Sequence, residues 1–217
     1  MKNIGLFGGT FDPVHRGHTE LARCAMNLCD LGEVIFIPAA APPHKKNSSV
    51  ATFKHRVEML KLAVSVEENF SISTIEETLA SPNYTIDTLT LFLKNTIAPC
   101  NYFFIIGVDA FLEIHTWKDS EGVLSSVNFI VSAREGYISE LFYAYMKNLC
   151  YSRKGSFWYN TKNGKKIYYL KSDIPDISSS KVREGLRQRN LSSDMIKPEV
   201  LKYMGEHRLY TTEIEVS

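Results

Sequence analysis

Apolar residues along this chain follow two patterns that alternate from the N-terminus onward. Short unbroken or alternating apolar runs, which are typical of strands in a buried sheet, occur at residues 4–7, 34–37, 70–75, 102–106 and 128–131. Stretches with apolar residues at helical spacing lie between them, at residues 18–29, 53–64 and 85–93. Strands separated by helices predict an α/β fold, with a Rossmann-like parallel sheet and helices on both faces.

Residues 136–171 follow a different pattern. A helix is expected at 141–149, and two strand-like stretches, 156–161 and 165–171, flank Lys162-Asn163-Gly164. Asn-Gly tolerates positive φ, so this turn predicts a β-hairpin. Six basic side chains favour a solvated β-excursion from the main fold: Arg153, Lys154, Lys162, Lys165, Lys166 and Lys171. A binding patch and a subunit contact are the alternatives.

The last part of the chain returns to helical spacing. Residues 181–189 and 199–204, with Pro198 at a first helical position, predict a small C-terminal helical part. We expect one domain over residues 1–217, in which 136–171 is a variable insertion and 177–217 forms the C-terminal part.

Composition narrows the class of protein. A chain of 217 residues with 44% hydrophobic and 23% charged residues suits one globular domain. Its net charge of +1 gives no reason to expect a nucleic-acid or membrane partner. No stretch approaches the roughly 20 apolar residues of a membrane span, and a strand begins too early for a signal peptide. Four cysteines without metal-binding spacing indicate reduced thiols, a chance disulfide being the alternative. We therefore expect a cytoplasmic protein.

The most informative segment is GGTFDPVHRGH at residues 8–18, between the first strand and the first helix. Backbone N–H groups at such a junction bind phosphates, and glycines let an anion approach closely. His15 and His18, three residues apart, can lie on one helix face and stabilise charge that develops on a phosphate chain. The alternative, a Gly-rich turn with two surface histidines, does not account for so many residues of this chemistry together.

Ser178-Ser179-Ser180 precedes the helix expected at 181–189. Serine hydroxyls and free N–H groups at a helix start favour an anion, and Arg183 could point back to the same group. Taken alone, this segment favours an ordinary serine N-cap beside a surface arginine. Together with the histidine segment, it indicates the second half of a phosphate clamp.

These segments resemble the nucleotidyltransferase superfamily defined by an HxGH element, and within it the nicotinate-nucleotide adenylyltransferases. Further matches occur in that family's order and spacing: Pro42-Pro43-His44-Lys45, Asn83-Tyr84-Thr85, Ile106-Gly107-Val108-Asp109, Trp117, Arg134 and the run from Ile177 to Arg183. The resemblance covers most of the chain but is poor over 135–171. It implies transfer of the adenylyl group of ATP to nicotinic acid mononucleotide in NAD biosynthesis, with Mg²⁺ carried by ATP.

The resemblance also implies roles for single residues. The ATP side would comprise Gly8, Gly9, Thr10, Phe11, His15, His18, Gly107, Asp109, Ser178, Ser179, Ser180 and Arg183, with His15 and His18 catalytic. The mononucleotide side would comprise Thr10, His44, Lys45, Thr85, Trp117 and Arg134. Trp117 would stack on the pyridine ring, and the helix start at Thr85 would receive its carboxylate. Asp109 would bind ribose hydroxyls or the metal–phosphate assembly.

Ordinary structural roles compete with several of these assignments. His44 and Lys45 suit a solvated turn, Trp117 suits core packing, and Asp109 suits a helix N-cap. Arg134 is followed by Glu135-Gly136, where the family often has Pro-Gly, so the local geometry of that loop is open.

Other functions share part of the pattern. Pantetheine-phosphate adenylyltransferase is the nearest enzymatic alternative, a cytidylyltransferase fits less well, and 217 residues leave no anticodon-binding module for a class I aminoacyl-tRNA synthetase. A nucleotide-sensing module without turnover is the alternative outside the enzymes. The expected partners are ATP and nicotinic acid mononucleotide, and a homo-oligomer is compatible with the sequence.

Overall fold

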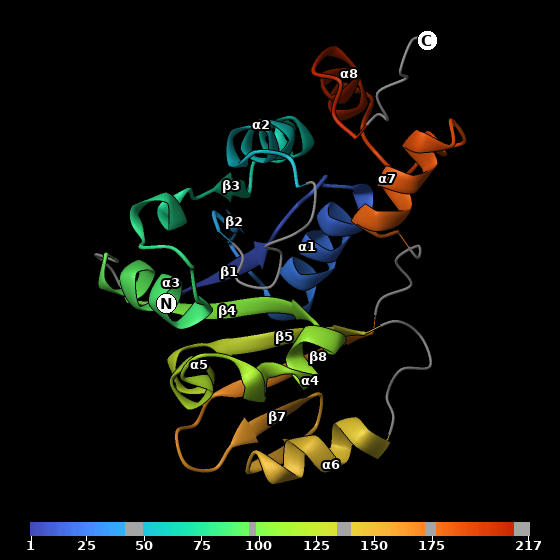
Figure 1. Ribbon diagram of the computed structural model, residues 1–217. Helices are drawn as coiled ribbons and strands as arrows, with labels where there is room; N and C mark the ends of the chain where they lie inside the picture. Colours follow the sequence, from blue (N-terminus) through green and yellow to red (C-terminus); the bar gives the residue numbers. More distant parts are fainter. Residues whose placement is uncertain (42–49, 96–98, 134–139, 172–176, 211–217) are drawn as a thin grey trace.

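The computed structural model describes residues 1–41, 50–95, 99–133, 140–171 and 177–210. Its centre is an eight-stranded sheet in the order β3-β2-β1-β4-β5-β8-β7-β6 (Figure 1). The strands are β1 Lys2–Gly9, β2 Glu33–Pro38, β3 Phe70–Ile72, β4 Cys100–Gly107, β5 Asn128–Ala133, β6 Tyr151–Lys154, β7 Phe157–Asn160 and β8 Lys166–Lys171. From β3 to β8 the neighbours in this order pair in parallel, whereas β7 and β6 are antiparallel. The predicted Rossmann-like sheet is confirmed.

Helices cover both faces of the sheet, as predicted (Figure 1). Residues from one set of helices share a core cluster with Phe7 of β1: α1 Arg16–Cys29, α2 Phe53–Val64, α7 Ser179–Arg187 and α8 Pro198–Glu206. A second set shares a cluster with Leu6: α3 Thr85–Lys94, α4 Val108–Leu112, α5 Ser120–Ser126 and α6 Glu140–Asn148. Successive strand residues thus point to opposite faces and feed two cores. None of the described helices combines the length and apolar character that a membrane crossing needs.

The segment that was expected to leave the fold as a solvated excursion instead extends the sheet. The predicted hairpin is present, with the N–H of Asn160 donating to the carbonyl of Lys165 at 2.7 Å and Gly164 at φ 73°. However, β8 pairs in parallel with β5, and Ile167 and Trp158 are 0% and 5% exposed. The expectation of a solvated excursion was wrong. It was based on the basic residues of the segment, whereas buried apolar residues lie between them in the sequence.

The parallel register brings several strand ends to one edge of the sheet. Gly9 of β1 is paired with Pro38 of β2, and Phe7 of β1 is paired with Ile105 of β4, two residues before Gly107. Ligands of such folds bind outside the carboxyl ends of the strands. The segments singled out in the sequence after β1 and after β4 therefore meet at this edge.

Candidate active site

The turn that follows β1 is built around the ring of Phe11. This residue adopts φ 51°, in the left-handed region that bulky side chains rarely occupy, and its ring is 1% exposed. A Cβ on Gly9 would lie 2.9 Å from that ring, and a Cβ on Gly8 would lie 3.0 Å from the ring of Phe104. Both glycines belong to β1. They make room for aromatic rings, and the turn itself falls at Phe11.

His15 and His18 lie together at the start of α1, as predicted. Their ring centroids are 3.7 Å apart. The backbone N–H of His15 donates to Nδ1 of His18 at 3.1 Å, so neutral His18 carries its proton on Nε2. A Cβ on Gly17 would lie 3.0 Å from Nδ1 of His15. Glycine at this position therefore allows the two rings and the helix start to pack closely.

Burial keeps both histidines uncharged near neutral pH. It lowers the pKa of His15 to about 4. Burial, followed by the charge of His15, lowers the pKa of His18 well below its ordinary value. Nδ1 of His15 is buried and has no hydrogen-bond partner among the described residues. Two neutral imidazoles can each donate one N–H to an anion, and a nearby polyphosphate would favour their charged forms.

This burial predicts acid sensitivity of the folded state. The unfolded chain binds a proton at His15 near pH 6.5, whereas the folded chain does so only near pH 4. The contribution of neutral His15 to the free energy of unfolding is therefore fully present above pH 6.5. It falls by about 3 kcal/mol as the pH is lowered to 4. Urea unfolding of wild type and of His15→Gln between pH 7 and pH 4 measures this loss. The variant should show a flatter pH dependence, and identical slopes would contradict a buried neutral His15.

Helix α7 brings the C-terminal part of the chain against this turn. The hydroxyl of Ser179 donates to the carbonyl of Pro13 at 2.9 Å. Arg183 donates through Nη1 to the carbonyl of Asp12, and the same nitrogen lies 3.5 Å from the Asp12 carboxylate. Arg183 therefore points back toward the turn, which is the direction expected for a phosphate clamp.

The other two serines have local contacts. Ser178 is the N-cap of α7, and its hydroxyl accepts from the N–H of Lys181 at 3.2 Å. The exposed Ser180 accepts from Nη2 of Arg183 at 3.3 Å. Ser178 thus fulfils the ordinary capping role that the sequence left open.

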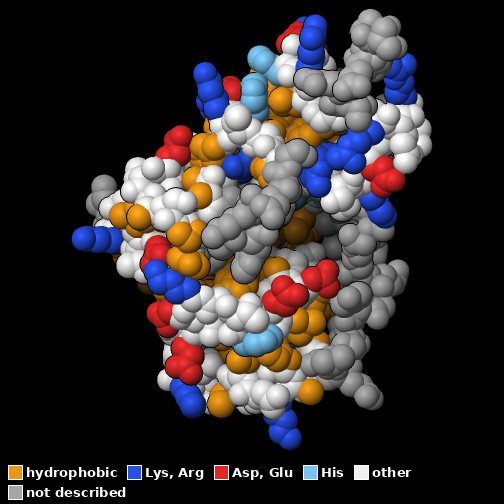
Figure 2. Space-filling view, viewed as in Figure 1, with side chains coloured by type: hydrophobic (Ala, Val, Ile, Leu, Met, Phe, Trp, Pro, Cys, Tyr) orange, Lys and Arg blue, Asp and Glu red, His pale blue; other side chains and the backbone are white. Residues whose placement is uncertain are grey.

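In the space-filling view, Lys and Arg side chains gather beside α7, and acidic side chains lie near α4 across a hollow (Figure 2).

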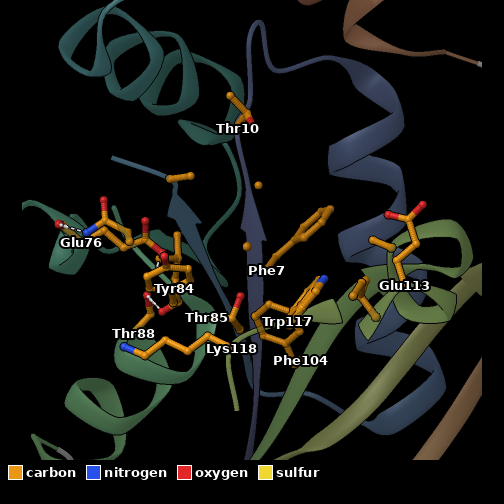
Figure 3. A pocket seen from close by; sticks show the side chains of 18 of the residues that line it. Phe7, Thr10, Glu76, Tyr84, Thr85, Thr88, Phe104, Glu113, Trp117 and Lys118 are labelled. Atoms are coloured by element: carbon orange, nitrogen blue, oxygen red, sulfur yellow. Dashed lines mark hydrogen bonds between the residues drawn. The ribbon is translucent and has the colours of Figure 1, made fainter. Parts of the chain in front are cut away.

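A cleft of about 460 Å³ opens at the ends of β1, β2 and β4. It is lined by the predicted residues Gly8, Gly9, Thr10, Thr85, Gly107 and Trp117. Thr85 begins α3 and Trp117 follows a 3₁₀ turn, η2 Ile114–Thr116, so the two come from different elements and both face the cleft (Figure 3). Trp117 is half-buried and also packs against the core, so the core packing that the sequence left open is confirmed for a residue that also lines the cleft.

The start of α3 offers backbone donors to this cleft. Its N-cap, Tyr84, provides no side-chain cap. The N–H groups of Asp87 and Thr88 donate to the carbonyl of Tyr84 at 3.0 and 3.1 Å. The preceding N–H groups, of Thr85 and Ile86, are those that a helix start presents to an anion.

Sequence analysis missed the polar residues that hold this helix start in place. Glu76, in the 3₁₀ turn η1 Ile75–Thr78, accepts from the Thr88 hydroxyl at 2.8 Å and from the Ala40 N–H at 3.1 Å. Asn83 accepts from the Ala41 N–H at 2.8 Å. Burial raises the pKa of Glu76. The only sequence signal for Asn83 was its place in the motif Asn83-Tyr84-Thr85. No pattern in the sequence indicated a role for the acidic pair Glu76-Glu77.

A salt bridge joins the two sides of the cleft. Nζ of Lys118, next to Trp117, lies 2.8 Å from Asp87 of α3 and 4.8 Å from the ring centroid of Tyr84. Lys118 also lines the cleft (Figure 3). The contact ties the Trp117 loop to the start of α3.

Some predicted residues do not join this site. Asp109 is exposed on α4 beside Gly107 and does not line the cleft. The predicted residues of the turn and of α7 are not among the lining residues of the cleft either, and they form a separate group beside it: Phe11, His15, His18, Ser178, Ser179, Ser180 and Arg183. His44, Lys45 and Arg134 lie outside the described residues. Within the described part, no cluster of three or more His, Cys, Asp or Glu side chains could hold a metal.

The class of protein follows from these features and from similarity. The family described as Cytidylyltransferase-like matches residues 6–185. A probable nicotinate-nucleotide adenylyltransferase of Desulfotalea psychrophila is 39% identical, over 97% of this chain and 100% of that protein. The nicotinate-nucleotide adenylyltransferase of Bacillus subtilis is 34% identical, over 97% and 99%. The chain therefore belongs to the nicotinate-nucleotide adenylyltransferase family.

Solved structures share the fold. The nicotinic acid mononucleotide adenylyltransferase of Plasmodium falciparum, complexed with NaAD, matches with a TM-score of 0.74 at 22% identity, over 97% of this chain and 98% of that one. A second structure of that protein, complexed with APC, matches with a TM-score of 0.70. The likeness extends to nearly the whole chain.

Proposed function

We propose that this enzyme transfers the adenylyl group of ATP to nicotinic acid mononucleotide, releasing pyrophosphate, as a step of NAD biosynthesis. The observation that carries the proposal is that two dissimilar groups of residues lie on either side of Phe7 of β1, which lines the cleft and whose ring centroid is 6.0 Å from that of His18. His15, His18 and Arg183 suit a polyphosphate. Trp117 and the open start of α3 suit a flat ring with an anionic substituent.

The reaction needs positioning and charge stabilisation rather than a covalent intermediate. A phosphate oxygen of the mononucleotide attacks the α-phosphorus of ATP, and the bond from that phosphorus to the oxygen bridging the α- and β-phosphates breaks. Charge moves onto the departing pyrophosphate. Nε2–H of His18 and the backbone N–H groups near Gly9, Thr10 and Phe11 are the donors that we assign to this charge.

On the acceptor side, the indole of Trp117 provides a stacking face for the pyridine ring. The N–H groups at Thr85 would receive the carboxylate, helped by the positive end of the α3 dipole. We also assign His44, Lys45 and Arg134 to the mononucleotide side, as the family resemblance implies. Gly107 and Asp109 are assigned to the ATP side.

Mg²⁺ is proposed to arrive with ATP, because the described residues offer no dedicated cage and Mg²⁺ prefers phosphate oxygens and water. It would supply charge neutralisation on the polyphosphate. Asp109 is the carboxylate that stands nearest in sequence to the strand end at Gly107. We further propose a cytoplasmic location, and a homo-oligomer remains compatible with the sequence.

Arg183 provides a test of the ATP side. Arg183→Ala should weaken ATP binding about tenfold or more, because a charge-assisted hydrogen bond to the β- or γ-phosphate is lost. The mononucleotide, which lacks those phosphates, should bind as before. Calorimetric titration of each ligand separately measures both constants. Exposed Arg187 of the same helix, changed to alanine, is the matched control, and an unchanged ATP affinity in the Arg183 variant returns it to a purely structural role.

The acceptor is identified by measuring pyrophosphate release from ATP with one candidate acceptor at a time. Nicotinic acid mononucleotide should support release, whereas phosphopantetheine and cytidylyltransferase acceptors should not. Release with phosphopantetheine alone would favour the pantetheine-phosphate enzyme. ATP binding without release for any acceptor would favour a nucleotide-sensing module.

A further inference from the structure

Arg56 of α2 is buried at the back of the phosphate-binding turn. It is 2% exposed, yet it carries a guanidinium group. Its three nitrogens donate to three backbone carbonyls: Nη1 to Thr10 at 2.7 Å, Nη2 to Ala39 at 2.8 Å and Nε to Ala51 at 3.0 Å. These carbonyls belong to the segments after β1, after β2 and before α2. Burying such a cation is costly unless it is fully paired, so an apolar side chain would be the simpler way to fill this space.

The bond to Thr10 sets the direction of one peptide group. A trans peptide is planar, so its C=O and N–H point in opposite directions. With the Thr10 carbonyl directed at Arg56, the N–H of Phe11 points away from α2. Phe11 itself is held at φ 51°. Backbone strain of this kind persists where the surroundings over-determine it, and it is concentrated at functional sites.

Asp12, the residue after Phe11, is held by hydrogen bonds to other parts of the chain. Asp12 is 2% exposed, and its Oδ1 accepts from the Ala51 N–H at 3.0 Å and from the Tyr210 hydroxyl at 2.6 Å. The carbonyl of Asp12 accepts from Arg183. Ala51 is therefore bound by Arg56 through its carbonyl and by Asp12 through its N–H, which joins the turn, the start of α2 and α7 into one network.

We propose that Arg56 is a positioning residue that orients the Thr10–Phe11 peptide so that the Phe11 N–H donates to the polyphosphate. Arg56 does not touch the nucleotide in this proposal, and acts through Thr10. The inference rests on the proposed function, because it takes the anion at this turn to be the polyphosphate of ATP.

Arg56→Lys tests the proposal with the charge retained. One ammonium group cannot replace a planar fork that binds three separate carbonyls. ATP affinity and kcat/KM for ATP should each fall about tenfold or more, as for a lost hydrogen bond to a charged group. Adenosine, which has no phosphates, should bind within about twofold of wild type. Val57→Ala, on the core side of the same helix, is the control for lost stability and should keep ATP affinity.

A folded Arg56→Lys protein with wild-type ATP affinity and turnover would overturn the proposal. If the variant does not fold, a second measurement on wild type decides. The amide resonance of Phe11 should shift on titration with inorganic pyrophosphate and with ATP, and an unmoved Phe11 amide would overturn the orientation that we assign. Neither titration needs an acceptor. A failure to form a dinucleotide would therefore contradict the proposed function without touching this inference.

Discussion

His18→Ala is expected to lower kcat about 10²–10³-fold, the usual cost of losing one preorganised donor to transition-state charge, while ATP affinity changes only a few-fold. The geometry supports this split. Nδ1 of His18 is occupied by the His15 N–H, so Nε2–H is the donor of the neutral ring. Because the free histidine is uncharged, its attraction for ATP in the ground state is modest, and it acts most strongly when charge moves to the leaving pyrophosphate.

Single-turnover measurements at saturating ATP separate the chemical step from binding. His207→Ala is the matched control, since His207 is exposed at the end of α8 and contacts His55 and Tyr203. It should retain wild-type turnover. A folded His18→Ala enzyme with near-normal kcat would remove His18 from the chemistry.

The largest effect is expected in the choice of acceptor, with kcat/KM for nicotinic acid mononucleotide exceeding that for its amide about 10²–10⁴-fold. Trp117 offers the same stacking face to both, so the discrimination must come from the donors at Thr85 and Ile86. A carboxylate accepts from both N–H groups, whereas an amide turns its own NH₂ toward one of them and leaves two donors, the NH₂ and the N–H that it faces, without an acceptor. Each unpaired buried donor costs about 1–3 kcal/mol, and about 1.4 kcal/mol is a tenfold change in rate.

Trp117→Ala separates stacking from discrimination. Both mononucleotides should lose kcat/KM by similar factors, and ATP binding should stay nearly intact. A preference for the amide in wild type, or a ratio near one, rules out this assignment of the α3 start. Loss of discrimination in Trp117→Ala would instead place the selective contact at the indole.

Local periodicity predicted most of the fold because β1 to β5 are short apolar strands between amphipathic helices. It failed at β8, which begins and ends with a lysine, Lys166 and Lys171. The parallel pairing of β8 with β5 joins residues about forty positions apart, such as Phe129 and Ile167. No local pattern in the sequence predicts this pairing. Similarly, β3 ends at Ile72 because Ile75–Thr78 forms a 3₁₀ turn whose Glu76 binds neighbouring segments.

The site could be predicted as far as its chemistry depends on local spacing. His15, Gly17 and His18 lie within one helical turn, so the sequence pattern was sufficient to predict that they pack together. Arg56 binds carbonyls 46 and 17 residues away, which no local pattern predicts. One signal was available. Arg56 follows Phe53 by three residues and precedes Leu60 by four, so helical spacing alone puts this charge on the buried face of α2.

The fate of a label at the α-phosphorus of ATP tests the central claim most directly. Incubated with the enzyme, Mg²⁺ and nicotinic acid mononucleotide, α-labelled ATP should yield nicotinic acid adenine dinucleotide that carries the label, with one pyrophosphate released per dinucleotide. Label recovered only in AMP or ADP, with no dinucleotide formed, would contradict adenylyl transfer by this enzyme.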